Sequence, residues 1–367
     1  MNFRAAVLHR VDQPLAIEDV SASDLKPADV LIRNHASGLC HTDLEVIQGS
    51  LAYPLPIILG HEGAGVVEAV GADVSQVRPG DHVVASWNPH CGHCFYCDQD
   101  QPILCEPFGA HQPQGRLLDG SSRLSLDGGP LHHFSMVCSH AEYSIVPESG
   151  AIVVPRDIPF DRACLIGCGV MTGVGSVLNV AHAQVGESVA VIGCGAVGLN
   201  AIQGARLVRA EPIIAIDTSA DKLALAETFG ATELIDASQS EAIPAVQSLT
   251  NGRGADNVIE CGGNEAAFRL AFEIARPGAD IVLLGKTNVD SNVSFRWGAM
   301  MGEKRMTRSS YGRARPRQHF PMLAKLYLDG ELLLDELISR RLRLDQINDG
   351  FTDMAAGRIV RAVVEMA

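Results

Sequence analysis

The sequence has no long apolar segment and no excess of positive charge. No apolar run reaches the ~18 residues of a membrane-spanning helix, and the opening stretch MNFRAAVLHRVDQPLAIEDV lacks the apolar core of a signal peptide. Lysine and arginine (29) are outnumbered by aspartate and glutamate (43), which gives a net charge of −14. Surfaces that bind nucleic acid or anionic membranes normally carry excess Lys and Arg. The composition therefore predicts a protein that binds neither.

The chain also lacks internal repeats and an export signal. No unit of about 20 to 50 residues recurs, which argues against a solenoid. Because ten cysteines accompany no export signal, clustered thiols are expected to be metal ligands in a reducing compartment rather than disulfides. We therefore expect a cytoplasmic protein. Its 367 residues are too many for one compact core, so two domains are expected.

The pattern of apolar runs, glycines and prolines changes twice along the chain. The first 160 residues contain short β-branched runs separated by Gly and Pro, the pattern of strands joined by turns. From about residue 170, apolar strands such as SVAVIG (188–193) alternate with helical stretches, which predicts βαβ units and a parallel sheet covered on both faces. After Tyr311 the pattern becomes two helices around a strand, followed by a closing strand. The sequence thus predicts a parallel-sheet domain, 171–310, inserted into a β-rich domain of residues 1–170 and 311–367.

Three glycines after the strand at 188–193 follow the spacing G-x-G-x-x-G: Gly193, Gly195 and Gly198. In a dinucleotide site the first permits a tight turn, the second lets the backbone approach the pyrophosphate, and the third allows close helix–strand packing. The next strand ends in Asp217, whose carboxylate would bind the ribose hydroxyls and repel a 2′-phosphate. We therefore expect NAD rather than NADP, with Lys222 flanking the ribose. A glycine-rich turn beside a solvated aspartate is the alternative.

Four cysteines lie close together in the spacing C-x2-C-x2-C-x7-C: Cys91, Cys94, Cys97 and Cys105. Four thiolates satisfy a tetrahedral structural zinc that is closed to water and substrate. Iron–sulfur clusters use similar spacings, but here no proline directly follows the fourth cysteine and there is no second cysteine set. Unrelated surface thiols are the remaining alternative. We expect a structural zinc.

A catalytic zinc needs three protein ligands and an open position. Candidates are Cys40 in GLCHTD, His61 in GHEGAG and Cys168 in IGCGVMTG. None is decisive singly, because a lone buried cysteine is usually a small apolar filler.

Taken together, the motifs resemble the zinc-containing medium-chain alcohol dehydrogenases. The order GLCHTD, GHEGAGVVEAVG, the four cysteines, GCGVMTGVG, VIGCGAVG and IIAID is that of the family, and the resemblance extends from Arg4 to Met366. It implies an α/β protein in which a Rossmann doubly wound parallel sheet is inserted into a β-rich, GroES-like catalytic domain with two zinc sites. It also implies that Cys40, His61 and Cys168 hold the catalytic zinc, with Glu62 behind the metal as an occasional ligand.

The resemblance assigns further roles just after Cys40. Asp43 would orient His61, or cap the start of a helix, and both roles can hold. Thr42 would take the alcohol proton, although a buried threonine bonded to its own backbone is the alternative. Relatives often have a histidine where this chain has Glu45. Either this carboxylate ends the proton relay, or the proton leaves through water.

Four more residues stand at cofactor-binding positions of the family: His41, Thr172, Val197 and Arg361. His41 and Arg361 match positions that contact the pyrophosphate. Several relatives have arginine in place of His41, and histidine, unlike arginine, is charged only near or below neutral pH. We therefore predict weaker NADH retention above neutral pH.

Substrate preference rests on a few positions of the resemblance. Trp87 and Phe134 match pocket walls and would form a narrow apolar throat, although both could instead be core aromatics. The segment FGAHQPQGRLLDGSSRLSLDGGPLHHFSM resembles the long loop of dimeric branches, including the glutathione-dependent formaldehyde dehydrogenases, so a homodimer is expected, with a tetramer as the alternative. Those enzymes carry acidic residues where this chain has the uncharged IQGSLAYPLP (47–56). This difference argues against a glutathione adduct as substrate.

The function implied is reversible, zinc-dependent oxidation of a primary alcohol (aromatic, allylic or medium-chain) to the aldehyde, with hydride transfer to NAD. One alternative is a thiol-adduct formaldehyde dehydrogenase that uses S-hydroxymethyl glutathione or mycothiol. Another is a non-catalytic NAD-binding protein. Two zinc ions per chain would favour the enzyme, and one would favour the binding protein.

Overall fold

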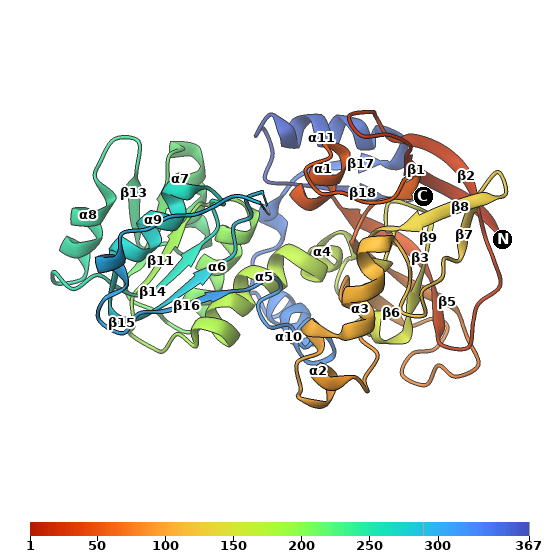
Figure 1. Cartoon of the computed structure of the whole chain (residues 1–367), viewed down its shortest axis with the longest axis horizontal. Helices are drawn as coiled ribbons and strands as arrows, with labels where there is room; N and C mark the ends of the chain where they lie inside the picture. Colours follow the sequence, from red (N-terminus) through yellow and green to blue (C-terminus); the bar gives the residue numbers. More distant parts are fainter. Residues whose placement is uncertain (289, 367) are drawn as a thin grey trace. The chain divides into compact units, whose positions relative to one another are not determined.

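The structure is a computed structural model that describes residues 1–288 and 290–366. The chain divides into two compact units, Met1–Cys168 with Arg315–Ala367, and Gly169–Ala314. Figure 1 shows that the first unit combines the red-to-yellow N-terminal segments with the blue C-terminal segments. The assignment of catalysis to one unit and cofactor binding to the other remains a prediction.

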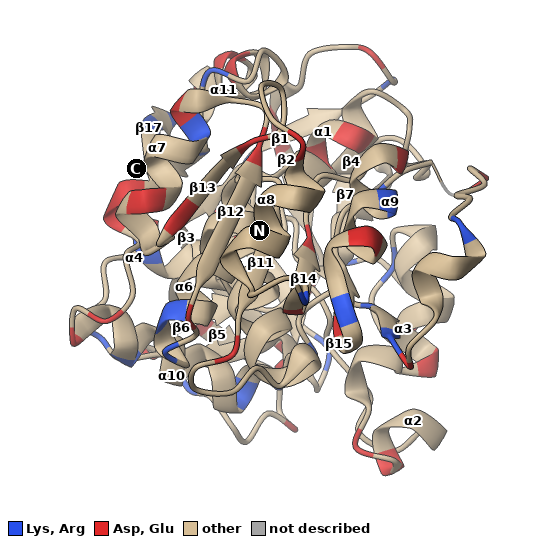
Figure 2. Ribbon diagram, turned by 90° about the vertical axis from the view of Figure 1, so that its left-hand side faces the viewer, with Lys and Arg blue, Asp and Glu red and all other residues tan. Residues whose placement is uncertain are grey.

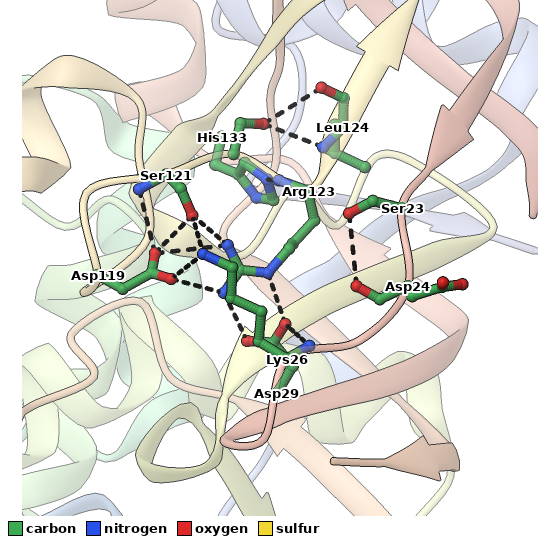
Figure 3. A network of polar contacts seen from close by, with 10 residues as sticks. Ser23, Asp24, Lys26, Asp29, Asp119, Ser121, Arg123, Leu124 and His133 are labelled. Atoms are coloured by element: carbon green, nitrogen blue, oxygen red, sulfur yellow. Dashed lines mark hydrogen bonds and ion pairs between the residues drawn. The ribbon is translucent and has the colours of Figure 1, made fainter.

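The first unit contains a closed barrel of short strands, ordered β1 (Asn2–Leu8), β2 (Ala16–Ala22), β7 (Leu124–Leu126), β8 (Gly129–His133) and β4 (Ile57–Ile58). Buried Arg123 ties this part to the adjoining sheet (Figure 3). Its guanidinium donates to both oxygens of Asp29, at 2.6 and 3.0 Å, and also to Asp119 at 3.1 Å. A bidentate ion pair of this kind fixes both the position and the orientation of the Arg123 side chain.

The second sheet of this unit has seven strands, and its register positions the candidate site. The order is β10 (Ala151–Val153), β6 (His82–Ala85), β5 (Glu62–Val70), β3 (Asp29–Gly38), β18 (Arg361–Glu365) and β17 (Ile338–Arg343), with β9 (Tyr143–Pro147) also pairing with β3. At its end, β3 places Gly38 opposite both Glu62 of β5 and Val363 of β18. Residues far apart in the sequence therefore meet at one end of β3.

Six helices complete the unit: α1 (His41–Ile47), α2 (Phe95–Asp98), α3 (Glu106–His111), α4 (Phe160–Leu165), α10 (Pro316–Leu328) and α11 (Ile347–Ala355). The prediction of two helices around a strand, followed by a closing strand, is confirmed by α10, β17, α11 and β18. One core cluster packs α1 and α11 against the strands through Leu44, Phe134 and Phe351, all buried.

The second unit is built on a parallel sheet, as the alternating pattern predicted. Its strand order is β13 (Glu233–Asp236), β12 (Ile213–Asp217), β11 (Val189–Ile192), β14 (Ala255–Glu260), β15 (Ala275–Leu283) and β16 (Arg305–Arg308). Every pairing in it is parallel. The crossover helices are α6 (Ala196–Leu207), α7 (Ala220–Phe229), α8 (Ala242–Leu249) and α9 (Glu265–Ile274). Figure 2 shows acidic and basic residues intermixed along the ribbon on this side.

One helical run differs from expectation. Phe160–Ala181 comprises α4, the π-helical turns η5 (Ile166–Val170) and η6 (Ser176–Ala181), and α5 (Met171–Gly175) between them. By length and mean hydropathy it could span a membrane, which the sequence analysis did not expect. However, 83% of its most apolar window is buried inside the protein, as in a core helix.

Candidate functional site

Three distant segments bring four metal-binding side chains together in the first unit. One potential ligand atom from each lies within 4.8 Å of the others, and the four residues, here called the Cys40 group, are Cys40, His61, Glu62 and Cys168. Thiolates, imidazole and carboxylate are the donors that zinc binds. Two sulfurs and one nitrogen leave a fourth tetrahedral position for water, substrate or the carboxylate. The donor set fits a catalytic zinc.

Three members of the Cys40 group lie at the ends of regular elements. Cys40 is the N-cap of α1, and Glu62 begins β5 directly after His61. Because Gly38 pairs with Glu62 in the β3–β5 ladder, the end of β3 and the start of β5 approach each other. Cys168 lies in η5, and π-helical turns are frequent at functional sites.

The electrostatics of this group favour an anionic sulfur beside a positive charge. Hydrogen bonding to Cys168 lowers the pKa of Cys40 well below that of an ordinary thiol; burial opposes this, while His61 and Arg361 reinforce it. Burial disfavours the charged form of His61, but Asp43 and Cys40 outweigh it and raise its pKa to about 10. A site that stabilises a thiolate beside a positive charge is suited to a divalent cation, which would displace the imidazole proton.

Asp43 is fully buried and fulfils both roles considered from the sequence. Its Oδ1 lies 3.2 Å from Nδ1 of His61 and accepts the Gly60 N–H at 3.0 Å. Its Oδ2 accepts the N–H of Cys40 at 3.1 Å, which caps α1. With Nδ1 of His61 held by the carboxylate, Nε2 is the nitrogen available to a metal.

Glu62 forms a buried ion pair with Arg361, the first residue of β18. The guanidinium donates to Oε2, whereas Oε1 has no hydrogen-bond partner among the described residues. The pair needs glycine at position 38, since a Cβ there would lie 2.2 Å from Oε2. An orphaned, buried carboxylate oxygen beside two thiols is consistent with a metal ligand. Arg361, predicted to contact the pyrophosphate, faces Glu62 in this structure.

The four clustered cysteines form a second compact group, here called the Cys91 group. The sulfurs of Cys91, Cys94, Cys97 and Cys105 all lie within 4.8 Å of one another. Backbone N–H groups point at them: Cys91 donates to the sulfur of Cys105 at 3.3 Å, and Glu106 donates to the sulfur of Cys94 at 3.5 Å. Burial opposes the thiolate of Cys94, but hydrogen bonds from the backbone and from other cysteines lower its pKa to about 6. Four sulfurs without an open position fit a structural zinc.

The three glycines of the second unit have the environments that a dinucleotide site requires. Gly193 has φ +89°, and a Cβ there would lie 2.8 Å from the backbone nitrogen of Gly262. A Cβ on Gly198 would lie 1.9 Å from the Gly193 carbonyl oxygen. By contrast, a Cβ on Gly195, the N-cap of α6, would meet no atom within 4 Å. The backbone is therefore open where a pyrophosphate would approach the helix N-terminus.

Asp217 lies at the end of β12, beside this glycine turn. Its carboxylate accepts backbone N–H groups from Cys194 at 2.7 Å, Thr218 at 2.8 Å and Ser219 at 3.0 Å. The acid thus fixes the glycine turn as well as carrying the charge expected at a ribose site. Lys222 is exposed on the following helix, α7.

Two family models match the chain. The alcohol dehydrogenase GroES-like domain matches residues 26–156, and the zinc-binding dehydrogenase domain matches residues 196–328. The S-(hydroxymethyl)glutathione dehydrogenase of Paracoccus denitrificans is 37% identical over 375 residues, which cover 99% of this chain and 100% of that protein. The chain belongs to the zinc-containing medium-chain alcohol dehydrogenase family.

Solved structures of similar proteins agree with this family assignment. An alcohol dehydrogenase zinc-binding domain protein from Burkholderia ambifaria is 34% identical, with a TM-score of 0.96, and the match covers 100% of this chain and 99% of that one. The benzyl alcohol dehydrogenase of Acinetobacter calcoaceticus is 28% identical, with a TM-score of 0.95 and full coverage of both chains. The predicted GroES-like and Rossmann architecture is confirmed.

The remaining positions predicted for this dehydrogenase family differ in exposure. On α1, His41 is exposed, while Thr42 and Glu45 are half-buried and share a helix face at i, i+3 spacing. In the second unit, Val197 is half-buried in the first turn of α6, and Thr172 is buried in α5. Their contacts with a cofactor stay predictions.

The two predicted pocket aromatics are packed against other rings. Phe134 has 0% exposure and lies in the core, with its ring centroid 5.5 Å from that of His61. Trp87 is half-buried, 6.2 Å from the ring of Phe108. Phe134 is thus buried in the core beside a predicted zinc ligand, and the pocket-wall role of both aromatics stays a prediction.

Sequence reasoning missed two residues next to the Cys40 group. Tyr53 forms a T-shaped contact with Phe134, whose ring also contacts His61. The Tyr53 hydroxyl accepts a hydrogen bond from Gln112, and burial raises its pKa. His140 is fully buried near Asp43. No motif contains them, because both reach the site through tertiary packing of the segment around residues 134–140.

Proposed function

We propose that this protein is an NAD-dependent zinc alcohol dehydrogenase that reversibly oxidises a primary alcohol (aromatic, allylic or medium-chain) to the aldehyde. The observation that carries the proposal is the convergence of Cys40, His61 and Cys168 beside Glu62. Three ligands of this kind leave a fourth tetrahedral position of a zinc ion to water, substrate or the Glu62 carboxylate. A purely structural metal site would close that position with a fourth fixed ligand.

When bound, zinc would supply a Lewis acid at the Cys40 group and NAD would supply the hydride acceptor. The protein's own part is to hold two thiolates, orient His61 through Asp43 and conduct a proton away. The Thr42 hydroxyl would accept the alcohol proton. From Thr42 the proton would pass to the Glu45 carboxylate one helical turn on, or to water. An unchanged pH profile of Glu45→Gln would favour the water route.

NAD is the proposed cofactor because the glycine turn and Asp217 act together. The open backbone at Gly195 suits a pyrophosphate, and the carboxylate suits ribose hydroxyls while repelling a 2′-phosphate. Lys222, Val197 and Thr172 would line the same site. Arg361 and His41 would also contact the pyrophosphate.

Substrate choice is supported by two lines of observation that point differently. The apolar rings of Trp87 and Phe134, and the likeness to a benzyl alcohol dehydrogenase, favour an aromatic or medium-chain primary alcohol. The relative named S-(hydroxymethyl)glutathione dehydrogenase supports the second candidate, oxidation of a thiol adduct of formaldehyde. Residues 47–56 offer no carboxylate to bind a glutathione amine, which ranks that candidate second.

The test is NADH formation with linear, allylic and benzylic alcohols, and with formaldehyde in the presence and absence of glutathione or mycothiol. Turnover of alcohols without any thiol supports the first candidate. Turnover of formaldehyde only with thiol supports the second. A protein that binds NAD, holds one zinc per chain and oxidises nothing would be the non-catalytic alternative.

We also infer a homodimer, with a tetramer as the alternative, and a cytoplasmic location. β16 is an edge strand of its sheet among the described residues. Three large apolar side chains on this strand or in the segment that precedes it are 78%, 62% and 47% exposed: Trp297, Met301 and Met306. An uncovered edge with apolar side chains suits pairing with a second copy. Light scattering tests the mass, and Trp297→Glu should shift it toward the monomer. No disulfide links any of the ten cysteines, all of which are described, and this supports the inference of a reducing compartment.

A further inference from the structure

Ser139 and His140 lie beside Leu59 and Gly60, the two residues between strand β4 and His61. The Ser139 N–H donates to the Gly60 carbonyl at 2.9 Å, and the His140 N–H donates to the Leu59 carbonyl at 3.1 Å. The approach is so close that a Cβ on Gly60, where φ is +90°, would lie 2.5 Å from the backbone nitrogen of His140. His140 is therefore held against the residues that immediately precede a zinc ligand.

The imidazole of His140 has one partnered and one unpartnered nitrogen, and its exposure is 0%. Nδ1 lies 2.8 Å from Oγ of Ser37, which in turn lies 2.7 Å from Oγ of Ser139. Nε2 has no hydrogen-bond partner among the described residues. The nearest acidic oxygen is Oδ1 of Asp43, 4.0 Å away and equally buried.

The surroundings select one tautomer of His140. If Nδ1 carried the proton, the lone pair of Nε2 would face the Asp43 carboxylate in a buried setting, where repulsion is weakly screened. If instead the Ser37 hydroxyl donates to Nδ1, the proton resides on Nε2 and its N–H dipole faces Oδ1. Ser139 can then donate to Ser37, so that each hydroxyl has a partner. The ring of Phe351, with its centroid 5.8 Å away, packs edge-on against the imidazole.

Asp43 Oδ1 is the atom on which these contacts converge. It accepts the Gly60 N–H at 3.0 Å and lies 3.2 Å from Nδ1 of His61. A buried carboxylate that holds an imidazole needs donors to keep it charged and oriented. At 4.0 Å the His140 N–H acts through its dipole rather than as a hydrogen bond.

We propose that His140 is a positioning residue for the catalytic metal site, acting through Asp43 on the orientation of His61. The inference rests on the proposed function only in taking the Cys40 group as a zinc site. His140 touches neither the metal group nor a substrate in this role, and its Nε2–H donor is the feature that matters.

Two substitutions separate the two nitrogens of His140. His140→Gln places an amide N–H near the position of Nε2 and keeps a donor toward Asp43, whereas His140→Asn matches Nδ1 and keeps only the Ser37 side. We expect His140→Asn to release one of the two zinc ions about 10 to 100 times faster to a chromogenic chelator. His140→Gln should remain within about threefold of wild type, because the Asp43 contact persists.

The control is His133→Gln, since His133 is also fully buried but accepts the Arg123 N–H at 3.2 Å instead of facing Asp43. It should leave zinc release unchanged. Ser37→Ala is the variant to use if the His140 variants do not fold. It removes one hydroxyl from the strand end and should accelerate release of the same zinc ion several-fold.

Equal release from His140→Asn and His140→Gln, or release from Ser37→Ala at the wild-type rate, would overturn the proposal. The accelerated ion is identified as the one missing from Cys40→Ser. Because zinc release requires no turnover, these results are independent of the substrate tests. A wild-type protein that holds two zinc ions but oxidises no alcohol would refute the proposed function and leave this inference standing.

Discussion

The Cys91 group and the Cys40 group differ in how the chain assembles them. All four ligands of the first lie between residues 91 and 105, around the short helix α2, and three of its four cysteines are only half-buried. The ligands of the second come from residues 40, 61, 62 and 168, and they meet because the end of β3, the start of β5 and the middle of η5 lie together. The ligands of the Cys91 group come from one short segment, whereas those of the Cys40 group are brought together by the pairing of distant strands.

Their surroundings differ in the same sense. The Cys91 group is held mainly by backbone N–H groups and its own sulfurs. The Cys40 group, which includes the buried carboxylate of Glu62, is enclosed by buried charges on Asp43 and Arg361. Backbone donors suffice to close a metal site that only braces a loop. A site with an open position needs side chains that orient each ligand and set its charge.

The largest contrast should come from removing one ligand of the Cys40 group. Cys40→Ser is expected to leave one zinc ion per chain instead of two. It should lower kcat/KM for alcohol oxidation by at least about 10³-fold, because the metal contributes several kcal/mol to the transition state. Metal analysis and NADH formation measure both effects. Cys164→Ser, a buried cysteine outside both groups, should retain both zinc ions; two zinc ions in Cys40→Ser would contradict the assignment.

The complementary substitution, Cys94→Ser, should lower the stability of the fold and leave the kinetics of the folded enzyme unchanged. Loss of the structural zinc is expected to remove about 3 kcal/mol or more, which corresponds to a melting temperature lower by about 10 °C. The protein that remains folded should keep the zinc of the Cys40 group and a wild-type KM for alcohol. Differential scanning calorimetry and kinetics on the same sample measure these two quantities. A changed KM in the protein that remains folded would mean that loss of the structural zinc also disturbs the Cys40 group.

In the second unit, the contrast is between Asp217 and Asp236, which pair across adjacent strands. Asp217→Asn keeps one of the two oxygens that accept backbone N–H groups and removes the negative charge. We expect the preference for NAD over NADP to fall about tenfold, which corresponds to about 1.4 kcal/mol. Asp236→Asn serves as the control and should leave the preference unchanged. Equal cofactor ratios in both variants would show that Asp217 does not face the ribose.

The smallest effect concerns two buried histidines of the first unit. Burial, with a contribution from Arg123, lowers the pKa of His133 to about 3, and burial lowers that of His140 to about 4. The unfolded chain, with a histidine pKa near 6.5, therefore binds more protons than the folded chain as the pH falls below neutrality. The free energy of unfolding is therefore highest above pH 6.5 and decreases as the pH falls below that value.

As the pH falls from 7.5 to 6.0, each of these histidines should lower the free energy of unfolding by about 1 kcal/mol, which corresponds to about 3 °C in melting temperature. His133→Gln should remove one such contribution and flatten the pH dependence of the melting temperature by that amount. An identical pH dependence in wild type and variant would show that His133 titrates alike in the folded and unfolded chains.

Much of the site could be predicted because its signals are local. The spacing of the Cys91 group identifies a closed thiolate site without any knowledge of the fold. The glycine pattern and the strand ending in Asp217 likewise predict a turn that the φ of Gly193 and the contact of Gly198 confirm. Alternating apolar strands and helices predict the parallel sheet, because each crossover places a helix over the strands.

Other features could not be predicted from spacing. Phe134, predicted as a pocket wall, is fully buried, because the segment after β8 packs its ring inward against His61. The ion pair of Glu62 with Arg361 joins positions 299 residues apart. It exists because both residues flank the same strand end.

The sequence by itself determined which residues could bind metal and phosphate, since those chemistries depend on residue type and short spacing. Only the tertiary structure decided which of them are oriented, paired and buried. The orientation of His61 depends on Asp43, the neighbourhood of Asp43 includes His140, and these contacts follow from strand register and loop packing. Burial then makes each of these polar contacts strong, because little solvent remains to screen it.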